Sequence, residues 1–192
     1  MKKQLDQTKA TRQKLFDAFW TSYQTKNIDK ISIGEITRIA GYNRGTFYEY
    51  FTDIYDVLSQ IEDELLSLIS DEIDELFTNG LPETIAEYSF RYASVFKKYD
   101  DRIFILLGPS GDPHFQPKLQ KIFLAKFVSL IRLPNDIPHM DYIQTFFFSS
   151  LVGMMTLWYD NGKDISEEEF IALMQKLVAS GIMGYTNVQL FS

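Results

Sequence analysis

Between Arg44 and Phe51 the sequence combines hydrogen-bonding side chains with two phenylalanines at helical spacing. Phe47 and Phe51 are four residues apart, so they share one face of a helix and would pack against a core. The positions left for the opposite face could place donors on base edges and phosphates, beside a glycine backbone that permits close approach. An exposed polar helix in an unrelated bundle is the alternative, but it gives no reason for two exposed tyrosines there. The positions on this outer face are Arg44, Gly45, Thr46, Tyr48 and Tyr50.

Two short helices are needed to position these side chains. Ser32 and Glu35 fit a capping box, which predicts a short helix that ends near residue 39. Gly41 breaks that helix because glycine adopts a left-handed backbone at little cost, and Asn43 can cap the next helix. Two short helices about three residues apart, with a glycine between them, form a helix-turn-helix. The inner face of the first is expected to be Ile33, Ile36 and Ile39.

Helices are expected along the whole chain. Periodicity near 3.6 residues recurs through most of the sequence, and the strict alternation of a half-buried strand is missing. The predicted fold class is all-α, with an N-terminal three-helix domain joined by a long helix to a larger helical bundle. Outside the helix-turn-helix, helices are expected at about 8–26, from a cap at Asp53 to 79, at 82–99, 115–132, 139–160 and 167–184. Residues 108–113 are expected to form a loop, and Ser166 with Glu169 a second capping box.

Composition limits the chemistry that the chain can perform. With 192 residues, 45% of them hydrophobic and 23% charged, it has a globular composition and is too short for a large multidomain enzyme. It contains no cysteine and two histidines, so no cofactor or metal site is predicted. Acidic runs at 62–64, 71–75 and 167–169 are interpreted as solvated helix faces or first-turn acids. The N-terminus has no apolar run, and the uncharged stretch 142–159 is too polar to favour a membrane span, so a cytoplasmic protein is expected.

Charge is divided unevenly along the chain. Residues 1–51 hold nine lysines and arginines against five acids, a net charge of +4, and the other 141 residues carry −11. A basic head on an acidic body suits a head that meets a polyanion, because attraction to phosphate depends on local cations. Charge alone would favour a solvated basic face, so the argument for nucleic acid rests on the motif.

Over residues 10–60 the sequence resembles the tetracycline-repressor (TetR) family of bacterial transcription regulators. The features that match in order and spacing are Ser32, Ile36, Ala40-Gly41, Arg44-Gly45-Thr46-Phe47-Tyr48 and Tyr50-Phe51. The resemblance implies a DNA-binding domain at 1–52 and a dimerisation and ligand-sensing domain at 53–192. It also implies a homodimeric regulator, more often a repressor, on a palindromic operator. The implied DNA contacts are Ser32, Arg38, Tyr42, Asn43, Arg44, Gly45, Thr46, Tyr48 and Tyr50.

Two positions depart from the family pattern. Ile54 stands where many members have a phosphate-binding lysine, so one backbone anchor is missing. Gly34 stands where some members place a long polar side chain that reaches a base, so base reading should fall more heavily on the helix after Asn43. Phosphate contacts are expected instead from Arg38 and from the N-terminal Lys2, Lys3, Lys9 and Arg12.

The acidic body carries candidate residues for a dimer interface and for an effector site. By resemblance, its last two long helices pack against their copies in a second subunit, where small residues would allow close approach. The expected interface is Ser149, Gly153, Leu173, Leu177, Ser180 and Gly181. Aromatic residues at helical spacing either fill a core or line an apolar cavity. The cavity interpretation assigns Tyr92, Phe96, Phe104, Phe123, Phe147, Met155 and Trp158 to the effector. No arginine is among them, so a neutral or weakly cationic, largely apolar effector is expected.

Two other classes of function compete with this interpretation. An enzyme is not favoured, because the sequence has no glycine-rich phosphate loop, nucleophile elbow or paired-histidine motif. A failure to bind DNA or heparin at low salt would revive it. A DNA-bound structural or partner-recruiting protein, with a collapsed core and no small-molecule ligand, is the second alternative. A cavity in the body distinguishes a sensor from such a protein.

Overall fold

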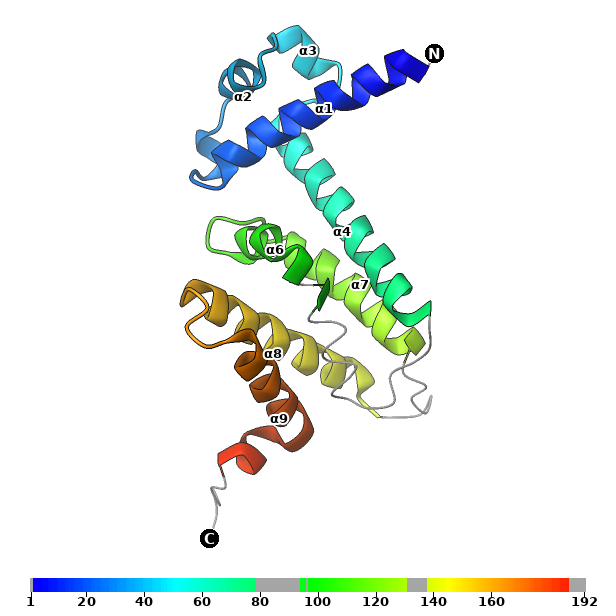
Figure 1. Cartoon of the computed structure of the whole chain (residues 1–192), viewed down its shortest axis with the longest axis vertical. Coiled ribbons are helices and arrows are strands. Elements are labelled where there is room, and N and C mark those ends of the chain that lie inside the picture. The colour runs from blue at the N-terminus through cyan, green and yellow to red at the C-terminus, as the bar shows by residue number, and fades with distance from the viewer. Residues whose placement is uncertain (1, 79–93, 96, 131–137, 187–192) are drawn as a thin grey trace. The chain divides into compact units, whose positions relative to one another are not determined.

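Every regular element that the structure describes is a helix, as the periodicity predicts (Figure 1). The computed structural model describes residues 2–78, 94, 95, 97–130 and 138–186. In chain order the elements are α1 (Lys2–Tyr23), the 3₁₀ turn η1 (Ile28–Lys30), α2 (Ile33–Ala40), α3 (Arg44–Tyr48), α4 (Ile54–Thr78), α6 (Asp100–Leu107), α7 (Phe115–Leu130), α8 (Met140–Asp160) and α9 (Glu167–Thr186). The all-α fold class is confirmed.

The chain forms two compact units. Unit 1 comprises Met1–Ser67 together with Pro109–Asp112, and unit 2 comprises Leu68–Gly108 together with Pro113–Ser192. The division therefore falls within α4, about four turns after the domain boundary at residues 52 and 53 that the sequence suggests. The units are therefore linked along the chain in two places: within α4, and through the short segment 109–112.

Unit 1 is built around aromatic residues of α1, of α3 and of the turn that follows α3. Phe47 and Phe51 lie in the core, and the Phe51 ring is 5.3 Å from Phe16 and 5.4 Å from Phe47, centre to centre. Helix α1 also buries Leu15 and Phe19 completely. A five-residue helix such as α3 has too few internal hydrogen bonds to persist alone, so this packing stabilises it and sets which of its faces points outward.

Caps define where the short helices begin and end. Ser32 Oγ accepts a hydrogen bond from Glu35 N at 3.2 Å, and Asn43 Oδ1 accepts one from Thr46 N at 2.9 Å. Gly41, with φ +75°, ends α2 in the left-handed conformation that the sequence predicts. Asp53 Oδ1 accepts from Asp56 N at 2.8 Å and so caps α4. The predicted helix-turn-helix and the predicted start of the long helix are both confirmed.

The buried face of α2 differs from the expected one. Ile36 is fully buried, but Ile39 is 45% exposed, and Thr37 is buried in its place. The Thr37 hydroxyl satisfies its hydrogen bond locally, donating to Ile33 O at 2.9 Å. At 100° per residue, a face centred between positions 36 and 37 leaves position 39 about 110° away around the helix, so its side chain points toward solvent.

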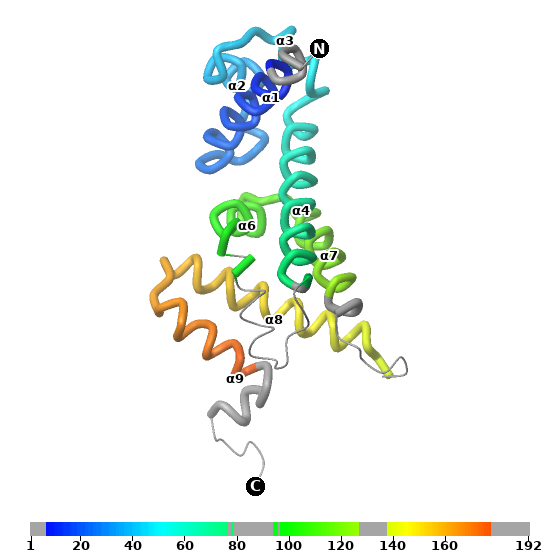
Figure 2. The backbone as a smooth tube through the Cα atoms, turned by 45° about the vertical axis from the view of Figure 1, so that its right-hand side comes forward, coloured from blue at the N-terminus to red at the C-terminus, as the bar shows by residue number. Residues whose placement is uncertain are grey.

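Unit 2 is a group of packed helices, in which α6, α7 and α8 contact one another and the end of α4 lies beside α7 (Figures 1 and 2). Phe104, Phe115, Phe123 and Phe148 are buried among them. Lys126 on α7 pairs with Asp74 on α4. These contacts hold the helices that surround the candidate ligand pocket described below.

Helix α6 does not appear among the expected elements. It begins after Tyr99 with Asp100 and Asp101 in its first turn and ends at Gly108, which also begins the predicted loop 108–113. The two acids favour the positive end of the helix dipole, which is the sequence signal for a new start there. Most of the helix expected at 82–99 lies outside the described residues.

Candidate DNA-binding surface and ligand pocket

Helix α3 presents a polar face to solvent. Arg44, Gly45 and Tyr48 are exposed, Tyr48 by 58%, whereas Phe47 in the same helix is fully buried. Thr46 and Tyr50 are half-buried. The division between inner and outer residues that the spacing predicts is thus present in the structure, and it leaves donors and acceptors available to a partner.

The other residues expected at this surface differ in how they are held. Arg38 and the two cap residues, Ser32 and Asn43, are exposed. Tyr42 is half-buried. Its hydroxyl donates a hydrogen bond to Thr11 Oγ1 at 3.4 Å, and this contact joins the turn between α2 and α3 to α1. Of the nine residues expected to contact DNA, six are therefore exposed, and Tyr42, Thr46 and Tyr50 are half-buried.

Arg12 is occupied within unit 1 rather than free for phosphate, in contrast to the expectation from sequence. Its guanidinium donates to Gln60 Oε1, from Nη2 at 2.7 Å and from Nε at 3.2 Å, and pairs with Glu64. It also lies 4.3 Å from the centre of the Phe16 ring. Arg12 therefore joins α1 to α4. Lys9 and Arg38 remain exposed.

The Glu35 carboxylate has two side-chain partners. Its Oε1 accepts from Lys26 Nζ at 2.6 Å and from Ser22 Oγ at 3.1 Å. The hydrogen bond from Lys26 is the main cause of the lowered pKa of Glu35. The carboxylate that was expected to reach back to Ser32 in a capping box instead accepts from Lys26 and Ser22, and so connects α2 to the end of α1.

A buried polar cluster lies at the C-terminal end of α1. Tyr23 is 3% exposed and donates from its hydroxyl to Ser110 O at 3.2 Å, which attaches segment 109–112 to unit 1. Burial, and then the charges of Glu62 and Asp112, raise the pKa of Tyr23 to about 12. Glu62 is fully buried, so the interpretation of 62–64 as a solvated face is wrong at this residue. Its spacing from the buried Leu58, Leu65 and Leu66 is the signal that could have revealed this.

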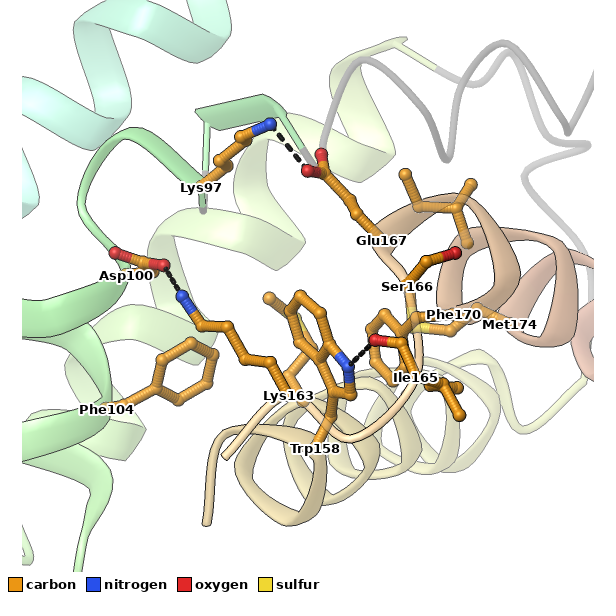
Figure 3. A pocket seen from close by; sticks show the side chains of 12 residues that line it. Lys97, Asp100, Phe104, Trp158, Lys163, Ile165, Ser166, Glu167, Phe170 and Met174 are labelled. Carbon is orange, nitrogen blue, oxygen red and sulfur yellow. Dashed lines mark hydrogen bonds and ion pairs between the residues drawn. The ribbon is translucent and has the colours of Figure 1, made fainter. Parts of the chain in front are cut away.

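Unit 2 contains a pocket of about 280 Å³ beside Trp158 (Figure 3). Its apolar wall stacks Trp158 on Phe170, with ring centres 4.6 Å apart and planes at 11°. The indole Nε1 donates to Ile165 O at 2.9 Å, which orients the ring. Phe104, Met155, Ile171 and Met174 add to the apolar lining, which draws on α6, α8 and α9.

Two ion pairs lie on the same pocket, as the dashed lines in Figure 3 show. Lys163 Nζ is 2.5 Å from Asp100 Oδ2, and Lys97 Nζ is 2.5 Å from Glu167 Oε2. These hydrogen bonds are the main reason that the pKa values of both lysines are raised. Each lysine therefore has a carboxylate partner, and the charged rim is balanced.

Lys163 reaches the pocket because of the turn that ends α8. Its φ is +59°, and that of the preceding Gly162 is +70°. Lys163 N donates to Trp158 O at 2.8 Å, which closes the turn. A left-handed backbone is unfavourable for a lysine, so the local structure holds strain at a residue that lines the pocket.

The residues expected at an effector site fall into three groups. Phe104, Met155 and Trp158 line the pocket. Phe123 and Phe147 do not; their rings stack on each other at 6.2 Å. Tyr92 and Phe96 lie outside the described residues. Among the residues that the structure describes, the lining includes no arginine, but it does include two lysines, Lys97 and Lys163, and their carboxylate partners, which the sequence pattern did not predict.

One face of α8 carries exposed apolar and small residues. Tyr142 and Phe146 are 73% and 76% exposed, and Ser149, Gly153 and Leu157 continue the same face. A Cβ built at Gly153 would meet nothing within 4 Å. Of the other expected interface residues, Leu173 and Leu177 are half-buried, and the side chains at positions 180 and 181 lie outside the described set.

Two features are absent from the part of the chain that the structure describes. No three histidine, cysteine or acidic side chains there come together as they would around a metal ion. None of the described helices combines the length and apolar character needed to cross a membrane.

Comparison with known proteins gives a family match over the second half of the chain. Residues 83–180, just over half of the sequence, match a TetR family model described as a transcriptional regulator C-terminal region. No curated protein matches the chain.

Several solved structures share the fold. A TetR transcriptional regulator from Streptococcus agalactiae is 22% identical, with a TM-score of 0.67 over 91% of this chain and 97% of its own. A TetR-like regulator from Mycobacterium smegmatis in complex with proflavine is 17% identical, with a TM-score of 0.60 over 95% and 99%. The regulator FadR from Bacillus subtilis in complex with stearoyl-CoA is 15% identical, with a TM-score of 0.63 over 88% and 98%. At these identities the likeness concerns the fold.

Proposed function

Because the chain belongs to the TetR family of transcriptional regulators, we propose that this DNA-binding regulator represses transcription as a homodimer on a palindromic operator and responds to a small effector. The observation that carries the proposal is the outer face of α3, where Arg44 and Tyr48 are exposed beside the fully buried Phe47. Arginine recognises guanine through two parallel hydrogen bonds, and tyrosine and threonine hydroxyls contact phosphates or bases.

A homodimer follows from the geometry of DNA. Two recognition helices must reach major-groove faces roughly 34 to 36 Å apart, and one chain supplies a single such helix. The exposed face of α8 supports this assembly, since Tyr142 and Phe146 would be covered by a second copy. Ser149 and Gly153 on the same face would let two helices approach closely.

The pocket beside Trp158 is the proposed effector site. Its wall is apolar and aromatic, and each of its lysines already has a carboxylate partner. An anionic ligand would have to displace Asp100 or Glu167, whereas a neutral or weakly cationic one keeps both ion pairs and gains the aromatic faces. We therefore assign a largely apolar effector without a carboxylate or phosphate. Relatives of the same fold have been solved with proflavine and with stearoyl-CoA, which supports a small-molecule ligand in general.

The pocket also bears on the alternative function. A DNA-bound structural or partner-recruiting protein without a ligand would have a filled body, and about 280 Å³ beside Trp158 favours the sensor instead.

Selection from a pool of random DNA duplexes tests the proposal. The purified protein is incubated with the pool at moderate salt, and bound duplexes are recovered and sequenced over several rounds. We expect enrichment of an inverted repeat whose half-sites are about one helical turn apart, centre to centre. Recovery of no sequence preference, or of a single unrepeated half-site, would contradict the proposed function.

A further inference from the structure

Gly34, on α2, lies directly against the side chain of Arg44 on α3. A Cβ built on Gly34 would be 3.2 Å from Arg44 Nη2, 3.8 Å from Nε and 3.9 Å from Cζ. The guanidinium therefore occupies the space beside α2 that any larger residue at position 34 would fill.

The hydrogen-bonding capacity of this guanidinium is unused. Among the residues that the structure describes, the Arg44 side chain forms no hydrogen bond or ion pair. Glu35, the acid next to Gly34 in the chain, is already bonded to Lys26 and Ser22. The first turn of α2 carries the positive end of the helix dipole and does not attract a cation. Arg44 thus lies beside Gly34 because there is room for it, with its donors available.

The backbone gives no reason for a glycine at this position. Gly34 is not among the described residues with positive φ, and it lies in the first turn of a regular helix. In a helix, glycine is less favourable than alanine, because it loses more conformational freedom on folding. Gly34 therefore weakens α2, and the feature that its missing side chain does provide is space for Arg44.

We propose that Gly34 is a specificity-determining residue of the DNA-binding surface. Because Gly34 has no side chain, the Arg44 side chain can lie beside α2, and this position of its guanidinium selects the base that Arg44 reads. This inference rests on the proposed function. An alanine at position 34 would require Arg44 to shift by a few tenths of an ångström. A leucine adds three more carbon atoms beyond that Cβ and so competes further for the space beside Arg44. Paired hydrogen bonds from a planar guanidinium to one base depend on distance and angle, so such shifts alter base preference.

The test compares sequence preferences among matched variants. Wild type, Gly34→Ala, Gly34→Leu, Arg44→Ala and the Gly34→Leu/Arg44→Ala double variant are each selected against the same random duplex pool. Ser67→Ala, an exposed helical substitution on α4, controls for a general gain in helix stability. Thermal unfolding of each protein accompanies the selection.

We expect Gly34→Ala to raise the melting temperature while weakening the preference that Arg44→Ala abolishes. Gly34→Leu should change that preference further, by about 5- to 100-fold at one base position of each half-site. In the Arg44→Ala background, Gly34→Leu should have no additional effect, because the side chain that it displaces is gone.

The outcomes separate the inference from the function on which it rests. If wild type enriches no motif, the proposed function fails. If wild type enriches a motif that Gly34→Leu leaves unchanged, or that Gly34→Leu changes equally with and without Arg44, Gly34 does not act through Arg44. In that case the inference is wrong and the proposed function stands.

Discussion

Arg44 and Tyr48 are exposed because Phe47, between them in α3, is buried. In a helix this short, one anchored side chain decides the direction of all the others. Phe51 adds a second anchor one turn later, with its ring 5.4 Å from that of Phe47. At the residue scale, the exposed polar face of α3, the proposed DNA-reading face, is therefore a consequence of core packing, and its polar residues can be changed without disturbing that core.

Arg44→Ala and Tyr48→Phe should weaken binding to the selected operator while leaving folding intact. The loss of a bidentate base contact costs about 1 to 3 kcal/mol, and the loss of one hydroxyl hydrogen bond about 0.5 to 1.5 kcal/mol. Fluorescence anisotropy with a labelled operator duplex measures both. Lys121→Ala, which removes an exposed cation from α7 in unit 2, is the control for net charge. If both variants bound the operator with wild-type affinity, α3 would not be the helix that reads the DNA.

Tyr23 makes the stability of the protein depend on pH at the alkaline end. Its pKa is raised to about 12 in the folded state by burial and by Glu62 and Asp112, against about 10 when unfolded. The folded state favours the neutral phenol, so this contribution is fully present below pH 10 and is lost as the pH rises toward 12. After allowance for solvent screening, it amounts to roughly 1 to 2 kcal/mol.

Tyr23→Phe should remove this dependence. Urea unfolding at pH 8 and at pH 11.5 gives the free energy of unfolding for both proteins. Since other tyrosines and lysines also titrate, the difference between variant and wild type is the quantity to compare. The phenylalanine variant should lose less stability between the two pH values than wild type does. Equal losses would place the Tyr23 hydroxyl in contact with solvent.

At the scale of elements, the helix-turn-helix was predictable from short-range rules. Ser32, Asn43 and Asp53 each accept a backbone N–H hydrogen bond at the start of a helix, and Gly41 takes the left-handed end of α2. Such caps depend on neighbours within a few residues, so the sequence contains all the information they need.

Features that depend on packing between distant segments were not predictable. Ile39 is exposed because α2, which packs on α1, buries Ile36 and Thr37, and no local rule determines that rotation. The charged rim of the pocket joins Lys97 to Glu167 and Asp100 to Lys163, pairs that are 70 and 63 residues apart in the chain. The left-handed turn at Lys163, where glycine or asparagine would be usual, gives no signal in the sequence either.

Gly153→Leu should break the proposed dimer without harming the single chain. A Cβ at this position meets nothing within 4 Å in the isolated chain, so leucine fits there and improves helix propensity. In a dimer through this face of α8 it would hold the two helices apart. Analytical ultracentrifugation should show a shift toward the monomer. Lys121→Leu adds a leucine to an exposed site on α7 and should leave the balance between monomer and dimer unchanged. If Gly153→Leu dimerised as tightly as wild type, the interface would lie elsewhere.

At the scale of the whole molecule, the proposed effector and the operator would have to act on the same equilibrium. A ligand in unit 2 alters DNA binding only if it binds the DNA-competent and incompetent arrangements unequally. Two stretches of chain link the units, α4 and segment 109–112. The second begins two residues after α6, which lines the pocket through Phe104, and is attached to α1 by the Tyr23 hydrogen bond to Ser110.

Trp158 provides a direct signal for this coupling. The chain has two tryptophans, so Trp20→Phe leaves the pocket indole as the single reporter. A panel of neutral, cationic and anionic aromatic compounds is titrated while fluorescence and operator affinity are followed together. We expect neutral or weakly cationic compounds to change both over one concentration range. Fluorescence changes that leave operator affinity constant, or a response limited to the acids, would contradict the proposed effector class.

The most direct test of the central claim is a titration of the selected inverted-repeat duplex and of its scrambled counterpart with the wild-type protein at several salt concentrations. The account predicts two chains per duplex, an affinity for the repeat at least about 10³-fold above that for the scrambled duplex, and a steep loss of affinity with salt. Equal affinity for the two duplexes, or one chain bound per repeat, would contradict a dimeric, sequence-specific regulator.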